Sequence, residues 1–300
     1  MARETFPLNI RSDTLWFQGK LSLSDFKTYV NLRKSQGFNT VQMCVGVPPE
    51  VGPDHPSARI DLMDAAKKID YLNKVEMLAI AYGAWGHQIE WLGVEGMKNW
   101  WGEIVEVLDN KNVVYCLTGE SNIWIGQENV LLPNKSTDDA RPMPNILSRI
   151  LHPIKLKQRK EKWSEVLAHL CSITQKPIII HVLGGEYSYG AVNNPEFLSA
   201  VTVQTGHGYI GDEKIRQIVL KGKKSYPNLP FLILEHQYEG LHSQFDHEQQ
   251  LHNYKLISGL TGNFCYGAQG IWNVGDGRFL AHWGKQTFDE ALKLKPPFNK

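Results

Sequence analysis

Short apolar runs alternate with amphipathic stretches along most of this chain. Seven of the runs have the length and the β-branched content typical of strands that are buried on both faces. A weaker candidate strand, residues 13–17, precedes them. The seven are residues 40–45, 77–81, 113–117, 177–182, 198–203, 231–234 and 264–268.

The stretches between these runs have the spacing of amphipathic helices. Residues 23–37 begin near Asp25 and end at Gly37, which fits a capping residue at the start of a helix and a glycine after its end. Residues 59–73 carry apolar side chains three and four positions apart. Further helices are predicted at residues 100–108, 160–173, 212–224 and 245–257.

Eight strands that are each followed by a helix form a (β/α)₈ TIM barrel, an α/β fold of about 250 residues. We therefore predict a single domain over residues 1–300. A doubly wound sheet has the same alternation, but no glycine-rich phosphate-binding motif follows any strand, which argues against its nucleotide-binding version. Residues 121–153 contain four prolines and are predicted to form an irregular loop after the fourth strand, and residues 293–300 a short tail.

Charge and cysteine content narrow the choice of partners. Thirty-two basic residues balance thirty-one acidic ones, so nothing in the net charge favours nucleic acid or an anionic membrane. The chain has no apolar run long enough to span a bilayer and no apolar signal segment near Met1. Its four cysteines are far apart without a CxxC motif, which is typical of core thiols in a reducing compartment. We expect a cytoplasmic protein without a cofactor, and the oligomeric state is not legible.

Two glutamates stand just beyond predicted strands four and seven. Chemistry in a TIM barrel lies at the carboxyl ends of the strands, so Glu120 and Glu235 should face each other across its mouth. Paired carboxylates around a cleft suit the cleavage of a glycosidic bond. A glutamate in such a position can instead cap a helix or form an ion pair.

Aromatic residues, 10% of the chain, are numerous around the same mouth. Indole rings can stack on the apolar faces of a sugar, while polar groups such as Glu239 bind its hydroxyls. We predict a ring of substrate-binding tryptophans around the two glutamates, made of Trp16, Trp85, Trp124 and Trp272.

Other kinds of site find less support. A metal-dependent hydrolase could use His181, His207 and Asp13, but it would need all three at one point, and no HExxH motif is present, so no metal site is predicted. Ser121 lacks the G-x-S-x-G motif of a serine nucleophile.

Five motifs, in order, resemble signatures of the apiosidase-like glycoside hydrolases, a TIM-barrel family. The resemblance extends over residues 12–292. The matching segments are Asp13-Thr14-Leu15-Trp16 (GDTxW), Arg33 to Gln42 (RxxxGFNxxQ), Gln204-Thr205-Gly206-His207 (QSGH), Glu235 to Gly240 (ExxYEG) and Ser258 to Trp272 (SGxxGxxYGxxxxW).

The resemblance implies a glycoside hydrolase that binds carbohydrate, with Glu235 as nucleophile and Glu120 as acid/base in a retaining reaction. We further expect Tyr238 or a neighbouring polar group to keep Glu235 ionised by hydrogen bonding, while a less polar setting beside Trp124 raises the pKa of Glu120 and keeps it protonated. The residues that would line the sugar subsite are Asp13, Gln42, His181, Gln204, His207 and Tyr238.

One departure from the family pattern leaves the mechanism open. The family has Gly-Gly-Asp and then a basic residue after strand four, whereas this chain has Gly119-Glu120-Ser121. The longer side chain could change the carboxyl separation and thereby the stereochemical outcome. A non-catalytic carbohydrate-binding protein derived from such a barrel is the alternative.

Overall fold

Eight parallel strands form the centre of the molecule in a computed structural model that describes residues 4–16, 18–46, 61–122, 146–206, 210–239 and 247–267. Six strands pair in the order β5-β4-β3-β2-β1-β8, and β6 pairs with β7. The strands are β1 (Arg11–Thr14), β2 (Thr40–Cys44), β3 (Leu78–Tyr82), β4 (Val113–Cys116), β5 (Ile178–Ile179), β6 (Val201–Gln204), β7 (Phe231–Glu235) and β8 (Phe264–Tyr266).

Side chains and single backbone bonds join the two sets of strands. Ser199 N–H donates to the carbonyl of Ile178 between the starts of β5 and β6. The amide of Asn263 donates to the carbonyl of Phe231 between β8 and β7. At the other end of this second seam, Glu239 N–H donates to the carbonyl of Gly267. The strands therefore form one curled layer.

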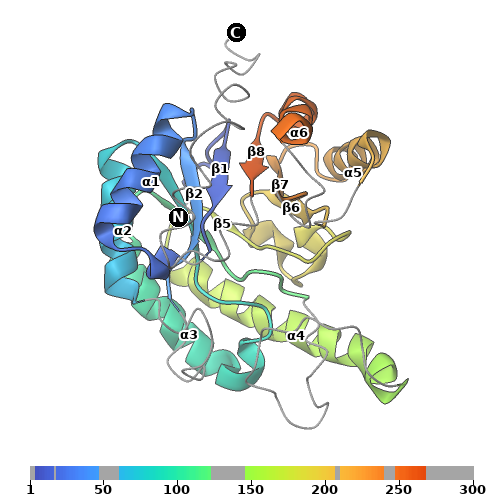
Figure 1. The fold of residues 1–300 in the computed structure, drawn as a ribbon. Coiled ribbons are helices and arrows are strands. Elements are labelled where there is room, and N and C mark those ends of the chain that lie inside the picture. The colour runs from blue at the N-terminus through green and yellow to red at the C-terminus, as the bar shows by residue number, and fades with distance from the viewer. Residues whose placement is uncertain are drawn as a thin grey trace.

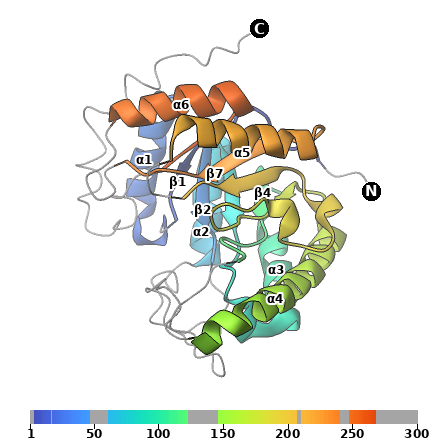
Figure 2. The ribbon, with the colours of Figure 1, turned by 90° about the vertical axis from the view of Figure 1, so that its right-hand side faces the viewer.

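The described part of the chain has six α-helices. They lie around the outside of the strands, and α5 and α6 lie side by side (Figures 1 and 2). Between β5 and β6 the described chain has only two 3-10 turns, η3 (Ser188–Gly190) and η4 (Pro195–Phe197), where a regular barrel has a helix. The helices are α1 (Leu23–Ser35), α2 (Leu62–Lys74), α3 (Ile89–Leu108), α4 (Ile146–Ile173), α5 (Asp212–Ser225) and α6 (His247–Thr261), with a 3-10 turn η1 (Gln18–Lys20) before α1.

Two of the predicted boundaries are wrong. Helix α3 begins at Ile89, well before residue 100, and Gly93 inside it has a non-helical φ of 72°, so two helical segments follow each other across a kink. Helix α4 begins at Ile146, so residues 146–153 are helical and not part of an irregular loop. Pro153 lies on an exposed turn of α4. Loss of one helical hydrogen bond there bends or weakens a helix without necessarily ending it.

Alternate residues of each strand belong to two different parts of the core. Side chains such as Ile80, Leu232 and Leu234 fill the interior of the strand layer, and those of Ala79 and Ile233 pack against the helices. This alternation follows from the two-residue repeat of a strand. Of the described helices, none is long and apolar enough to cross a membrane.

A buried ion pair fastens α1 to β1. Arg33 Nε donates to Asp13 Oδ2 over 2.6 Å, and the Tyr29 hydroxyl donates to the same oxygen over 2.7 Å. Both charged side chains are almost fully buried. The Arg33 guanidinium also lies 5.0 Å from the centre of the Phe38 ring. The charge of Arg33 thus depends on Asp13 for its compensation.

We predict that Asp13→Asn lowers the free energy of unfolding by about 3–5 kcal/mol, because it leaves the guanidinium of Arg33 buried without an opposite charge. Chemical denaturation would measure the change. Glu95→Gln is the matched control, since it removes an exposed ion pair with Lys98 and should change stability by about 0.5 kcal/mol or less. Equal effects of the two substitutions would contradict the importance of the buried pair.

Candidate active site

Glu120 extends the edge of the strand layer beyond β4. Gly86 N–H donates to the carbonyl of Gly119 over 2.8 Å, and Gly119 N–H to that of Ala84 over 2.9 Å, so the β3 and β4 chains stay side by side past the strand ends. Glu120 then takes a φ of 38°, in the left-handed region that few residues other than glycine adopt. A Cβ on Gly86 would lie 2.3 Å from the carbonyl oxygen of Glu120, so only glycine fits there.

The carboxylate of Glu120 accepts two hydrogen bonds, each 3.3 Å long. Trp85 Nε1 donates to Oε2, and Gln204 Nε2 donates to Oε1. Burial raises the pKa of Glu120 above its ordinary value, and the donations from Trp85 and Gln204 oppose that rise. The strained backbone thus presents a carboxyl group that holds its proton more readily than an exposed one.

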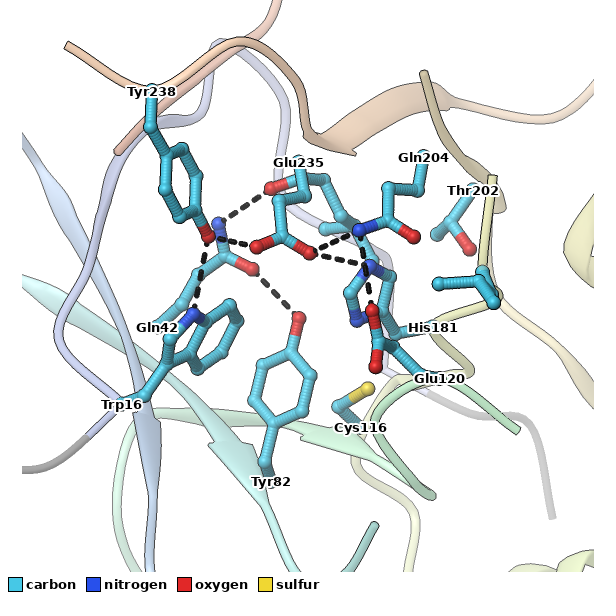
Figure 3. A network of polar contacts seen from close by, with 12 residues as sticks. Trp16, Gln42, Tyr82, Cys116, Glu120, His181, Thr202, Gln204, Glu235 and Tyr238 are labelled. Atoms are coloured by element: carbon cyan, nitrogen blue, oxygen red, sulfur yellow. Dashed lines mark hydrogen bonds and ion pairs between the residues drawn. The ribbon is translucent and has the colours of Figure 1, made fainter. Parts of the chain in front are cut away.

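Glu235 ends β7 and is 3% exposed. Its Oε2 accepts from Gln204 Nε2 over 2.6 Å and lies 3.4 Å from His181 Nε2 (Figure 3). Its Oε1 accepts from the Tyr238 hydroxyl, which in turn accepts from Trp16 Nε1 over 3.2 Å. Burial raises the pKa of Glu235 well above its ordinary value, and the negative charge of Glu120 raises it further.

The two carboxylates share one amide donor. Because Gln204 Nε2 is 2.6 Å from Glu235 Oε2 and 3.3 Å from Glu120 Oε1, these two oxygens are at most about 6 Å apart. Two buried carboxylates at this distance titrate as a coupled pair. The hydrogen bonds that Glu235 accepts from Tyr238 and Gln204 favour its ionised form, whereas burial and the charge of Glu120 raise its pKa.

A second layer of polar contacts supports Glu235 from inside the strand layer (Figure 3). Gln42 Nε2 donates to the Ser12 hydroxyl over 2.9 Å and to the carbonyl of Leu234 over 3.1 Å. Gln42 Oε1 accepts from the Tyr82 hydroxyl over 2.7 Å. Gln42 is fully buried, so it supports the site from below. Tyr82, absent from the sequence-based site, could have been found because it ends β3 on the same face as Ile80.

Of the predicted ring of tryptophans, the structure describes one buried residue and one partly exposed residue. Trp16 is 3% exposed and packs edge-on against Tyr82 and Trp85, with ring centres 4.7 and 5.6 Å away, and its ring stacks beside His181 at 6.3 Å. Trp85 is partly exposed beside Glu120. Of these two tryptophans, Trp85 is thus the better placed to meet a ligand.

Two predicted site residues point elsewhere. Asp13 faces α1 and bonds to Arg33, because Ser12, its neighbour on β1, takes the inward face. The metal-site hypothesis requires Asp13 and His181 to converge on one point, and because Asp13 faces α1 they do not. The carboxylate of Glu239 accepts from the Tyr266 hydroxyl over 2.7 Å. Three predicted residues, Trp124, His207 and Trp272, lie outside the described residues.

Within the described part of the chain, no three histidine, cysteine, aspartate or glutamate side chains cluster closely enough to hold a metal ion. The four cysteines, Cys44, Cys116, Cys171 and Cys265, are free thiols. Burial raises the pKa of Cys44 and of Cys265 to about 12, so both thiols stay protonated near neutral pH. Among the described residues at the mouth, the two carboxyl groups both have raised pKa values.

Comparison with protein families and known structures gives an independent view. The family model described as "Apiosidase-like, catalytic domain" matches residues 6–295. Comparison with curated protein sequences gave no match. A solved glycoside hydrolase family 5 protein from Bacteroides vulgatus superposes with a TM-score of 0.67 and 17% identity. The alignment covers 93% of this chain and 65% of that one, just under two thirds of its length.

Two further structures are similar. A family 5 glycoside hydrolase from Prevotella bryantii, solved with a xyloglucan tetradecasaccharide, has a TM-score of 0.57 and 14% identity over 91% of this chain and 86% of its own. An endo-1,4-beta-mannanase from Rhizomucor miehei has a TM-score of 0.57 and 11% identity over 89% and 88%. At these identities the likeness establishes the fold, and the predicted TIM barrel is confirmed.

We predict that Glu120→Gln lowers the pKa of Glu235 by about one unit or more, because it removes a negative charge that raises this pKa. A ¹³C NMR titration of the glutamate carboxyl groups would measure it. The control is Glu186→Gln, on an exposed side chain bonded to Asn122, which should leave the titration of Glu235 in place. An unchanged pKa in Glu120→Gln would mean that the two carboxyls do not interact.

Proposed function

The chain belongs to the family of apiosidase-like catalytic domains, and from this premise we propose that it is a retaining glycoside hydrolase with Glu120 and Glu235 as its reacting groups. The observation that carries the proposal is the shared contact of both carboxylates with Gln204 Nε2. Retaining glycosidases have carboxyl groups about 5–5.5 Å apart, whereas inverting enzymes leave about 6.5–9.5 Å for a water molecule. A limit of about 6 Å between the nearest oxygens favours retention.

Glu235 is the proposed nucleophile. It is the more deeply buried of the two, and its oxygens accept the shorter bond from Gln204 and the bond from Tyr238. When the two carboxyl groups together hold one proton, these donors stabilise the ionised form of Glu235. In the first step an oxygen of Glu235 attacks the anomeric carbon, the bond from that carbon to the leaving oxygen breaks, and the leaving oxygen takes the proton from Glu120.

Glu120 is the proposed acid and then base. It lies at the more open side of the pair, and burial raises its pKa, which suits a group that must hold a proton near neutral pH. In the second step the ionised Glu120 accepts a proton from water. The water oxygen bonds to the anomeric carbon, and the bond to Glu235 breaks. Both carboxyl groups then return to their starting protonation states.

The substrate proposed is a carbohydrate chain. Trp85 is a partly exposed residue beside Glu120, where an indole can make apolar contact with a sugar. The Prevotella bryantii structure holds a xyloglucan oligosaccharide, which supports a plant polysaccharide or its fragments as the substrate class. A non-catalytic binding protein would have no need for two carboxylates that converge on one amide at the expense of strong repulsion.

We predict that Glu120→Gln lowers kcat on glycosides with poor leaving groups by a factor on the order of 10²–10⁴, because it removes the proton donor. On 4-nitrophenyl glycosides, whose leaving group needs little protonation, the first step should survive and added azide should restore turnover. Glu235→Gln should abolish turnover on both kinds of substrate, since it removes the nucleophile.

Steady-state kinetics on a panel of 4-nitrophenyl and alkyl glycosides would measure these effects, with Glu186→Gln as the control at wild-type rates. Full activity of either catalytic variant on any accepted glycoside would contradict the assignment. Carbohydrate binding without turnover in the wild-type protein would instead support the non-catalytic alternative.

A further inference from the structure

Gln204 is held between the two carboxylates by its backbone as well as by its side chain. Its carbonyl accepts from Gly185 N–H over 3.1 Å, and Thr205 N–H, one residue on, donates to the carbonyl of Glu235 over 3.0 Å. A register shift after Val203 places Gln204 directly opposite Glu235 in the β6–β7 pair. The side chain of Gln204 is almost fully buried. It has little freedom to turn away from the two glutamates.

The chemistry of an amide suits this position. The Gln204 amide nitrogen carries two N–H groups, so it can donate to Glu235 and to Glu120 at the same time. An amide is neutral and does not titrate. A lysine or arginine here would hold both carboxylates ionised, which would leave the pair without the proton that acid catalysis needs.

We propose that Gln204 is a positioning residue that fixes the distance between Glu120 and Glu235 and adjusts the proton affinity of both through one shared donor. The inference rests on the proposed function, and it gives Gln204 a different role from the sugar contact that the sequence implied. Because Gln204 acts through the two carboxylates, its loss should change the pH profile and kcat more than KM. Loss of Gln204 should raise the pKa of both glutamates, since the two hydrogen bonds that it donates favour their charged forms.

The first test replaces Gln204 by Met, which has a similar length and no donor. A ¹³C NMR titration of the glutamate carboxyl groups should show both Glu120 and Glu235 shifted upward by about one pH unit. The kcat on an accepted 4-nitrophenyl glycoside should fall by a factor on the order of 10² with little change in KM, as expected when reacting groups lose their alignment. The acidic and basic limbs of the pH–rate profile should both move to higher pH.

The matched control is Gln36→Met. Gln36 is also a buried glutamine, but its side-chain oxygen accepts from Arg33 at the end of α1, away from the two carboxylates. This substitution should leave both titrations and the pH–rate profile where they are in the wild-type protein. A shift in Gln204→Met no larger than in this control would overturn the proposal, and so would a shift of Glu235 alone.

A second variant covers the case in which Gln204→Met does not fold. Gln204→Glu keeps the shape of the side chain and places a third carboxyl group between the other two, so the titrations of Glu120 and Glu235 should again both move upward. Unchanged titrations in this variant would refute the positioning role. If the wild-type protein hydrolyses no glycoside while both titrations move as expected, the proposed function fails and the coupling through Gln204 stands.

Discussion

The repulsion between two buried carboxylates, joined by one neutral donor, is the constraint on which the rest of this site depends. Glu120 and Glu235 cannot both ionise easily at a separation of about 6 Å or less, so the pair retains a proton at pH values where exposed glutamates have lost theirs. Acid catalysis needs such a proton, and nucleophilic attack needs the other carboxyl to be ionised. The close approach of the two carboxylates destabilises the folded protein, but it also leaves one of them protonated to act as the acid and the other ionised to act as the nucleophile.

The surrounding structure holds this arrangement in place. Glu120 has a left-handed backbone conformation, and the close approach of Gly86 and the ladder bond to Gly119 pack the chain tightly around it. Glu235 is fixed from the other side, since Gln42 bonds to the carbonyl of Leu234 just before it. Strain and burial on both sides have to be balanced by the packed core. The buried pair of Asp13 and Arg33 belongs to that support, because it locks α1 onto the strand that passes beside Gln42.

The alternation of apolar runs and helical patterns was sufficient to predict the barrel and to bring Glu120 and Glu235 to its mouth. It located all eight strands, although β1 and β5 each end three residues earlier than predicted. It did not show which face of a strand each residue takes, which is why Asp13 was assigned to the sugar site although it faces α1. The partner of Asp13, Arg33, lies on the following helix, so the pattern of residues around Asp13 does not predict the contact. The early start of α3 was hidden by the kink at Gly93. The shared donor Gln204 depends on a register shift between β6 and β7, which no local pattern contains.

The most direct test of the account is to trap the reaction halfway. A 2-deoxy-2-fluoro glycoside with a good leaving group slows both steps but the second one more, so a covalent intermediate accumulates on a retaining enzyme. Mass spectrometry of the intact protein and of its peptides should find one sugar attached to the peptide that carries Glu235, and the adduct should disappear as activity returns. A sugar on any other residue, or hydrolysis to a product of inverted configuration, would contradict the account.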